Sequence, residues 1–190
     1  MFFDNKAFNG DISKWVVRRV TSMSYMFSGC TNFNGDLSSW NVSNVIHMND
    51  MYGNTAFNGD ISKWDVRRVT SMDSMFEGST NFNGNLSLWN VSNVITMFEM
   101  FRSTRFNTDI SHWRVDKVTT MHAMFWGNTA FNGDISKWDV RRVASMNHMF
   151  QGSTNFNGNL SSWDVFNVIT MHEMFRSWGN TAFNGDISKW

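Results

Sequence analysis

Apolar and polar positions follow one another along this chain in a pattern that returns every 24 or 25 residues, with a last interval of 27. A Phe-Asn pair opens each unit, and a tryptophan follows seven residues after that phenylalanine. The anchors begin at Phe8, Phe33, Phe57, Phe82, Phe106, Phe131, Phe156 and Phe183, and the tryptophans are Trp15, Trp40, Trp64, Trp89, Trp113, Trp138, Trp163 and Trp190. Self-similarity at a fixed period is the signature of tandem repeats. The sequence therefore predicts seven complete units followed by a truncated copy.

Within a unit the apolar residues keep fixed distances from the tryptophan. In the first complete unit they are Ile12, Trp15, Val17, Val20, Met23 and the pair Met26-Phe27. Residues 14–17 alternate, with Val16 facing away from its two neighbours, which predicts a short strand. From Val20 onward, steps of three, three and one residues place the apolar side chains on one helical face. The pattern thus predicts a unit made of a strand, a turn and a helix.

Glycine occupies two slots of the unit. Seven of the eight anchors continue as Asn-Gly, such as Asn34-Gly35, and the exception is Asn107-Thr108. Asn-Gly is the strongest dipeptide signal for a tight turn, because both residues tolerate positive φ. A second glycine, such as Gly29 or Gly78, follows most Met-Phe pairs and is typical of the residue after a helix. Each predicted helix is therefore expected to end there, and a tight turn is expected at each Asn-Gly.

One unit of this kind cannot bury its own apolar face, whereas stacked units bury it in a continuous core. The spacing Ile-x-x-Trp-x-Val-x-x-Val matches that of leucine-rich repeats. We therefore expect residues 1–190 to form a single α/β repeat solenoid of the leucine-rich-repeat type, with partial first and last units. Its seven or so coils of 24–25 residues would stack through short parallel strands about 4.8 Å apart, each followed by a short helical segment.

The segment 57–76, Phe-Asn-Gly-Asp-Ile-Ser-Lys-Trp-Asp-Val-Arg-Arg-Val-Thr-Ser-Met-Asp-Ser-Met-Phe, resembles the bacterial-surface-protein repeat. This repeat is associated with surface lipoproteins of listeriae and mycoplasmas and is grouped with BspA-like leucine-rich repeats. The resemblance covers essentially the whole chain. It implies a solenoid with a cell-surface or adhesive role in bacteria and without catalytic residues. Residues 1–6 lack the basic-then-apolar pattern of a signal peptide, which leaves the compartment open.

The composition excludes several other classes of protein. Cys30 is the one cysteine, so no disulfide forms within the chain, and we interpret it as an incidental thiol in a turn. No apolar run approaches the roughly 20 residues of a membrane span. Sixteen basic and sixteen acidic residues give a formal charge of zero, which argues against a bulk polyelectrolyte binder. What remains is a repeat protein held together by its apolar core.

Motifs that mark common catalytic sites are missing. The chain has no phosphate-binding loop, no His-Glu-x-x-His pair, no Cys-x-x-Cys pair and no Gly-x-Ser-x-Gly elbow. We therefore expect no enzyme activity, no cofactor and no bound metal. Three histidines, His122, His148 and His172, fall in neighbouring slots of successive units, and paired imidazoles bind Zn²⁺ or Ni²⁺. Since no carboxylate or thiol has an obligatory place beside them, we interpret them as solvated surface residues.

An acidic slot lies four residues before the tryptophan. It holds Asp11, Asp36, Asp60, Asp109, Asp134 and Asp186, with Asn85 and Asn159 in two other units. Stacked carboxylates repel one another unless backbone N–H groups or a cation such as Ca²⁺ compensate them. Asparagine holds an Asx-turn as aspartate does, but it adds no charge for a cation. The slot is therefore predicted to hold a turn rather than a calcium ion.

Basic residues gather around the tryptophan. The strip from one residue before each tryptophan to four after it holds 12 of the 16 basic residues and 4 of the 16 acidic ones. The candidate contact residues are Lys14, Arg18, Lys63, Arg67, Arg114, Lys137 and Arg141 of this strip, together with Trp126 and Trp178 of a turn slot. Within the strip, Lys63, Asp65 and Arg67 are expected to lie side by side and partly neutralise one another.

Two interpretations of the basic strip compete. One is protection of strand edges and solubility, for which lysine and arginine are usual devices. The other is an acidic partner: a protein surface, an anionic glycan or nucleic acid. Nucleic acid is the least favoured of the three, because no aromatic platform interleaves the charges.

Neither end of the chain carries a recognisable cap sequence. Uncapped apolar coils promote association, so we expect the ends to dock on a partner, to stack end to end, or to continue into a longer array. The predicted function is that of a non-enzymatic scaffold or accessory subunit, with a protein partner or a larger assembly. The alternative is an adhesin-like cell-surface protein for an anionic or protein ligand. A hydrolase of surface polymers is the weaker hypothesis, because a polar catalytic cluster is missing.

Overall fold

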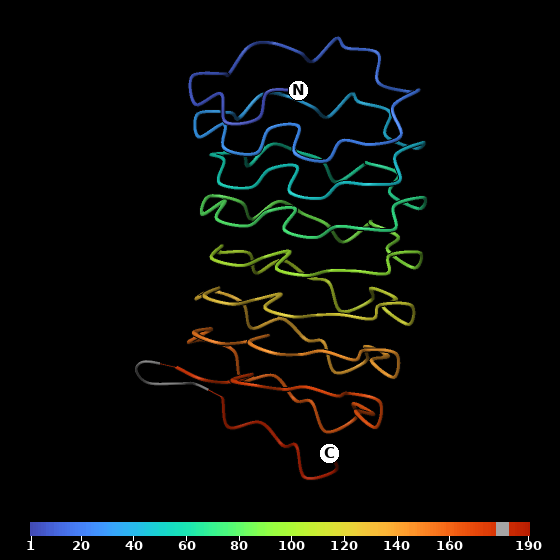
Figure 1. The fold of residues 1–190 in the computed structure, drawn as a ribbon, viewed down its shortest axis with the longest axis vertical. Coiled ribbons are helices and arrows are strands. Elements are labelled where there is room, and N and C mark those ends of the chain that lie inside the picture. The colour runs from blue at the N-terminus through green and yellow to red at the C-terminus, as the bar shows by residue number, and fades with distance from the viewer. Residues whose placement is uncertain (178–182) are drawn as a thin grey trace.

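The chain winds into flat coils that stack along the long axis of the molecule, with its two termini at opposite ends of the stack (Figure 1). This computed structural model describes residues 1–177 and 183–190. Residues one repeat apart lie next to each other in neighbouring coils, and a row of isolated parallel β-bridges fixes this register. The row runs through Ser22, His47, Ser71, Thr96, Thr120, Ser145 and Thr170.

The predicted helices and strands are not formed. Residues 1–177 and 183–190 contain no α-helix, and hence none that would cross a membrane, and their β-structure is confined to the bridges just named. There are therefore no helix or strand bounds to give. The expectation of an α/β solenoid of the leucine-rich-repeat type, with a strand near residues 14–17 and a helix from Val20 to Phe27, is wrong. The bridge residue Ser22 lies inside the segment for which the helix was predicted.

Short turns shape each coil, and a recurring kind is closed by a backbone N–H that donates to the carbonyl three residues earlier. In the third coil these bonds join Trp64 to Ile61, Val69 to Val66, Met75 to Met72, Ser79 to Phe76 and Phe82 to Ser79, at 2.9–3.2 Å. The side chains at both ends of these turns are buried. A period of about three residues therefore comes from successive corners of the coil, and it resembles the period of one helical face.

The segment with the predicted helical face uses its N–H groups between coils. Every second N–H from Met72 to Gly78 donates to a carbonyl of the next coil, at 2.7–3.2 Å. Ser74 and Gly78 have left-handed backbones, with φ of 51° and 67°. A right-handed helix needs φ near −63° at every residue, so these two positions exclude it. A Cβ added to Gly78 would also lie 2.3 Å from Asn54 Oδ1, which explains the glycine without a helix end.

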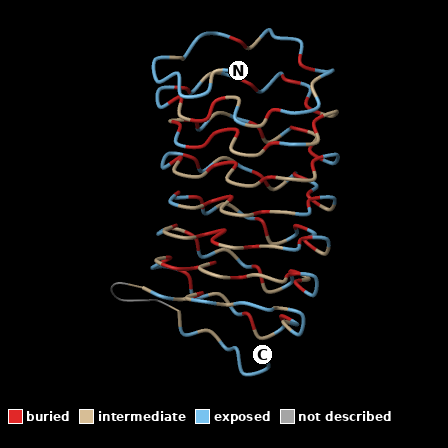
Figure 2. Cartoon of the chain, in the orientation of Figure 1, coloured by how far each residue is buried: buried red, intermediate tan, exposed pale blue. Residues whose placement is uncertain are grey.

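Two columns of aromatic rings fill the core. One column contains the phenylalanines of the Phe-Asn anchors, and the other contains Phe2, Phe27, Tyr52, Phe76, Phe101, Phe125, Phe150 and Phe175. Phe76 stacks on Phe82 of its own coil at 3.8 Å between ring centroids and on Phe101 of the next coil at 5.7 Å. Burial is greatest in the middle coils, while the first and last coils are largely exposed (Figure 2).

The tryptophans join neighbouring coils through their indole nitrogens. Trp89 Nε1 donates to the carbonyl of Ile61 at 3.0 Å, and that side chain is 2% exposed. Equivalent bonds of 3.0–3.3 Å are made by Trp40, Trp64, Trp113, Trp138, Trp163 and Trp190. Each of these seven tryptophans therefore satisfies its polar atom on a neighbouring coil while its rings pack against the apolar core.

The anchor asparagines form a ladder instead of the predicted tight turns. Asn58 N–H donates to Asn34 Oδ1 at 2.8 Å, and Asn58 Oδ1 accepts from Asn83 N–H at 2.9 Å. Neither residue of Asn58-Gly59 has a positive φ, so the prediction of a turn there is wrong. Glycine follows asparagine because a Cβ on Gly59 would lie 2.8 Å from Cε2 of Phe57, whose ring folds over the backbone.

Candidate functional site

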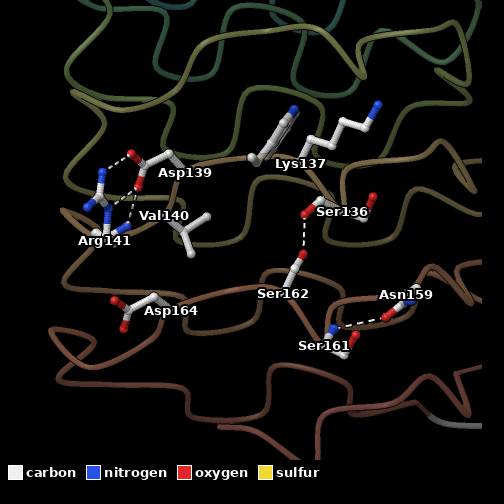
Figure 3. Close-up of a pocket in the computed structure, with 10 residues that line it drawn as sticks. Ser136, Lys137, Asp139, Val140, Arg141, Asn159, Ser161, Ser162 and Asp164 are labelled. Atoms are coloured by element: carbon white, nitrogen blue, oxygen red, sulfur yellow. Dashed lines mark hydrogen bonds and ion pairs between the residues drawn. The ribbon is translucent and has the colours of Figure 1, made fainter.

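Hollows lie at the tryptophan slots of several coils. One of about 670 Å³ is lined by Lys137, Asp139 and Arg141 and, from the next coil, by Asp164 (Figure 3). A second hollow of about 450 Å³ is lined by the same lysine, aspartate and arginine and by Arg114 of the preceding coil. A third of about 380 Å³, at the equivalent place three coils earlier, is lined by Lys63, Asp65 and Arg67 among others. We call the surface formed by Lys63, Arg67, Arg114, Lys137 and Arg141 the basic face.

The arginines of the basic face are paired with neighbouring carboxylates. Arg67 Nη2 lies 2.7 Å from Asp65 Oδ2, and Arg141 repeats this pair with Asp139 at the same distance (Figure 3). Hydrogen bonds from these arginine side chains hold the pKa of Asp65 and Asp139 below the ordinary value. Arg114 Nε lies 3.5 Å from Asp116 Oδ1. The predicted neutralisation of Arg67 by Asp65 is therefore present, and its contribution to stability is small because the arginine is 68% exposed.

The lysines of the basic face differ from its arginines. Within the described residues, Lys63 and Lys137 form no ion pair with a carboxylate. Lys14 and Arg18 occupy the equivalent slots of the first coil and are exposed. Val16, which is 82% exposed, stands between them where Asp65 and Asp139 stand in other coils. The basic face therefore carries ammonium groups that are open to a ligand beside guanidinium groups that are fixed by aspartate.

Trp126 does not belong to the basic face. Its ring lies under the guanidinium carbon of Arg102, 4.3 Å from the ring centroid, and stacks with His148 at 5.6 Å. The side chain, predicted as a contact residue, is half-buried in this cluster. Trp178, the other tryptophan predicted as a contact residue, lies outside the described residues.

The acidic slot forms the predicted Asx-turns. Asp60 Oδ1 accepts from the backbone N–H of Ser62 at 2.9 Å, and Asn85 accepts the equivalent bond from Ser87 at the same distance. The side-chain and backbone hydrogen bonds from Ser62 lower the pKa of Asp60, with a smaller contribution from the charge of Lys63. The same shift occurs at Asp11, Asp36, Asp109, Asp134 and Asp186.

These Asx-turns predict a loss of stability in acid. A carboxyl whose pKa is lowered in the folded protein stabilises the fold above its unfolded pKa of about 3.9, and this stabilisation is lost as the pH falls through the folded value. The double variant D60N/D134N keeps the turns and removes two of the titrating groups. We therefore expect its melting temperature to fall less than that of the wild type between about pH 5 and pH 2. Thermal melts at several pH values measure this difference. If the melting temperatures of the variant and the wild type fell equally over this pH range, the assignment would be contradicted.

The three histidines of the sequence pattern lie together. The ring of His148 meets His122 edge-on at 5.4 Å and His172 edge-on at 5.3 Å between centroids. Burial is the main cause that lowers the pKa of His122, followed by the charges of His148 and Arg102. His148 Nδ1 lies 2.7 Å from Gln151 Oε1 and 3.6 Å from Oε2 of Glu173. Gln151 and Glu173 were not among the residues predicted from the sequence, although Glu173 directly follows His172 in the chain.

Cys30, interpreted from the sequence as an incidental thiol in a turn, lies where two turns meet. It is fully buried, and its Sγ donates to the carbonyl of Phe2 at 2.9 Å. Burial is the main cause that raises the pKa of the thiol above its ordinary value. A buried thiol with a raised pKa is a poor nucleophile, so Cys30 is part of the core packing.

The regular coils, the ladders between them and the matching slots in every coil define a tandem-repeat protein. The family described as "Mycoplasma protein of unknown function, DUF285" matches residues 1–109 and 102–190, and the chain belongs to this family. No curated protein and no solved structure matches the chain. The family match fits the resemblance to a bacterial repeat family, while a relation to BspA-like leucine-rich repeats is not confirmed.

Proposed function

We propose that this chain is a non-enzymatic repeat protein that binds an acidic segment of a partner protein along its basic face, as a scaffold or accessory subunit. The observation that carries the proposal is the arrangement of Lys63 and Lys137. Each lies in a hollow, forms no ion pair within the described residues, and has beside it an arginine that aspartate holds in place. Such preordered charge attracts an oppositely charged partner and sets its register.

An acidic protein fits this face better than a nucleic acid does. Single-stranded nucleic acids bind through aromatic platforms on which the bases stack. At the basic face the indoles of Trp64 and Trp138 are only 3% and 2% exposed, and their Nε1 atoms are already bonded to backbone carbonyls. A partner therefore meets cations, aspartates and serine hydroxyls rather than open rings. Carboxylate side chains match the ammonium groups without needing a stacking surface.

The adhesin-like alternative uses the same charges for an anionic ligand at a cell surface. It draws on the resemblance to surface repeats and on membership of a repeat family. Association of the stack through its ends stays a prediction from the sequence. Trp15, 41% exposed in the first coil, is the kind of apolar surface that such contacts bury.

Labelled poly-L-glutamate is the probe for the basic face. We expect fluorescence anisotropy to show binding that weakens at least about tenfold between low and high salt, because exposed charges are screened. The variant K63Q/K137Q should bind the probe roughly three- to tenfold more weakly than the wild type, since two exposed ion pairs are lost. Light scattering at the same concentrations separates this binding from self-association.

The matched control removes the same charge from outside the strip. K6Q/R105Q lowers the net charge by two as well, at exposed positions that line none of the three hollows. Its affinity for poly-L-glutamate should equal that of the wild type. Equal losses in both double variants would show that only net charge matters and would overturn the proposal. Tight binding of dextran sulfate without binding of poly-L-glutamate would favour the adhesin-like alternative.

A further inference from the structure

The cluster around His148 is separate from the basic face and is made by two neighbouring coils. His148 comes from one coil, and His172 and Glu173 come from the next. The backbone fixes this contact, because His148 N–H donates to the carbonyl of His172 at 2.8 Å. None of these residues lines the hollows of the basic face. Whatever the cluster does is therefore independent of the partner binding proposed above.

The side chains of the cluster place three ligand atoms together. One atom each from His148, His172 and Glu173 all lie within 4.8 Å of one another. Two ligands bound at about 2.1 Å to a tetrahedral zinc ion are about 3.4 Å apart. The separation of His148 Nδ1 from Glu173 Oε2 is 3.6 Å, close to that value. A small movement of side chains would therefore bring the three ligand atoms to bonding distance of one ion.

The surroundings hold the side chains of His148 and Glu173 in place. Gln151 Oε1 lies 2.7 Å from His148 Nδ1, and Gln151 Nε2 donates to Glu173 Oε2 at 3.1 Å. Trp126 stacks on one side of the His148 ring. Arg176 forms an ion pair with Glu173, so a bound cation competes with a guanidinium for that carboxylate. The left-handed backbone at His148 and Glu173 recurs in the same slot of other coils and is part of the fold rather than of the cluster.

We propose that His148, His172 and Glu173 form a site for one Zn²⁺ ion that joins two successive coils near the C-terminal end of the stack. Two imidazoles and one carboxylate are a donor set that zinc prefers, whereas magnesium and calcium prefer oxygen ligands alone. Metal binding through Nδ1 of His148 replaces the hydrogen bond to Gln151, whose amide keeps its bond to Glu173. Three protein ligands leave a fourth position for water.

Zinc titration of the whole chain tests the site. Calorimetry with zinc chloride should show one ion bound per chain, and a tenfold excess of magnesium should not displace it. H172Q and E173Q should each weaken zinc binding by about tenfold or more, because each removes a direct ligand. Zinc should also raise the melting temperature of the wild type, since it binds only the folded pair of coils.

Two other histidines supply the matched controls. His47 and His112 are exposed and lie outside the three-ligand cluster, so H47Q and H112Q should bind zinc as the wild type does. His172 is itself exposed, and its replacement by glutamine leaves the backbone contacts intact, so H172Q should fold and melt like the metal-free wild type. The proposal is overturned if the wild type binds no zinc at about 0.1 mM. It is also overturned if H112Q weakens binding as much as H172Q does.

Discussion

The variant F82A should unfold with a free energy about 3–5 kcal/mol lower than that of the wild type. Phe82 is fully buried and stacks on Phe76 at 3.8 Å, on Phe57 at 6.2 Å and on Phe106 at 6.1 Å between ring centroids. Alanine at this position loses the transfer free energy of the ring and leaves a cavity between three coils. Because each coil contacts only its neighbours, a defect in the middle weakens two interfaces at once. Urea denaturation followed by tryptophan fluorescence measures the change.

The control for this prediction is another large apolar residue six positions along the chain. Leu88 is 73% exposed, so L88A should change the free energy of unfolding by less than about 0.5 kcal/mol. If F82A and L88A lowered the free energy of unfolding by similar amounts, the aromatic column would not be a main source of the stability of the core. A F82A chain that unfolds in two separate steps would instead show that the stack divides at the damaged coil, which fits the same packing.

The spacing of residues in the sequence was sufficient to identify the repeat and its buried positions. The tryptophans, the anchor phenylalanines and the valines recur at fixed offsets, and in the middle coils they are buried as expected. The secondary structure was not predictable in the same way. Steps of three residues fit a helical face, but they fit a coil of three-residue turns equally well. The choice between the two depends on left-handed residues such as Ser74, whose side chain gives no signal of a positive φ.

The glycine slots show why local turn rules failed. Asn-Gly is a turn signal when the chain must reverse within a few residues. In this fold the asparagine is needed for its side-chain oxygen, which the next coil uses, and the glycine is needed for room beside a ring. The first need comes from a residue one repeat away, whereas the second comes from the ring of the phenylalanine two residues before the glycine. A rule that looks only at neighbours in sequence cannot contain the bond between coils, whereas the Asx-turn at Asp60 is local and was predicted.

The candidate sites also contain some features that follow from local sequence spacing and others that depend on contacts between coils. The charges of the basic face and the Arg67–Asp65 pair follow from positions two residues apart. His148 lies one position later in its unit than His122 and His172 do in theirs. In the structure its ring contacts both of theirs. Its carboxylate, Glu173, was in the sequence beside His172, but its proximity to His148 depends on the register of two coils. The contact of Trp126 with the cation of Arg102 also joins residues of two coils.

Replacing Trp89 by phenylalanine should lower the free energy of unfolding by about 1–3 kcal/mol. The variant W89F keeps an aromatic ring but loses the indole N–H that donates to Ile61 at 3.0 Å, and it loses part of the packed volume. The carbonyl of Ile61 still accepts from the backbone N–H of Trp64 at 3.1 Å, so it is not left without a donor. This second bond is the reason that the expected loss is smaller than for F82A.

Trp15 provides the comparison that isolates the indole bond. It occupies the same slot in the first coil, is 41% exposed, and makes no indole hydrogen bond within the described residues. W15F should therefore change the free energy of unfolding by less than about 0.5 kcal/mol in the same urea titration. If W15F and W89F were equally stable, the row of indole bonds would add nothing to the cohesion of the coils, and ring packing alone would hold them together. A loss confined to W89F means that tryptophan recurs in this slot because it provides both an apolar surface and a hydrogen-bond donor to the neighbouring coil.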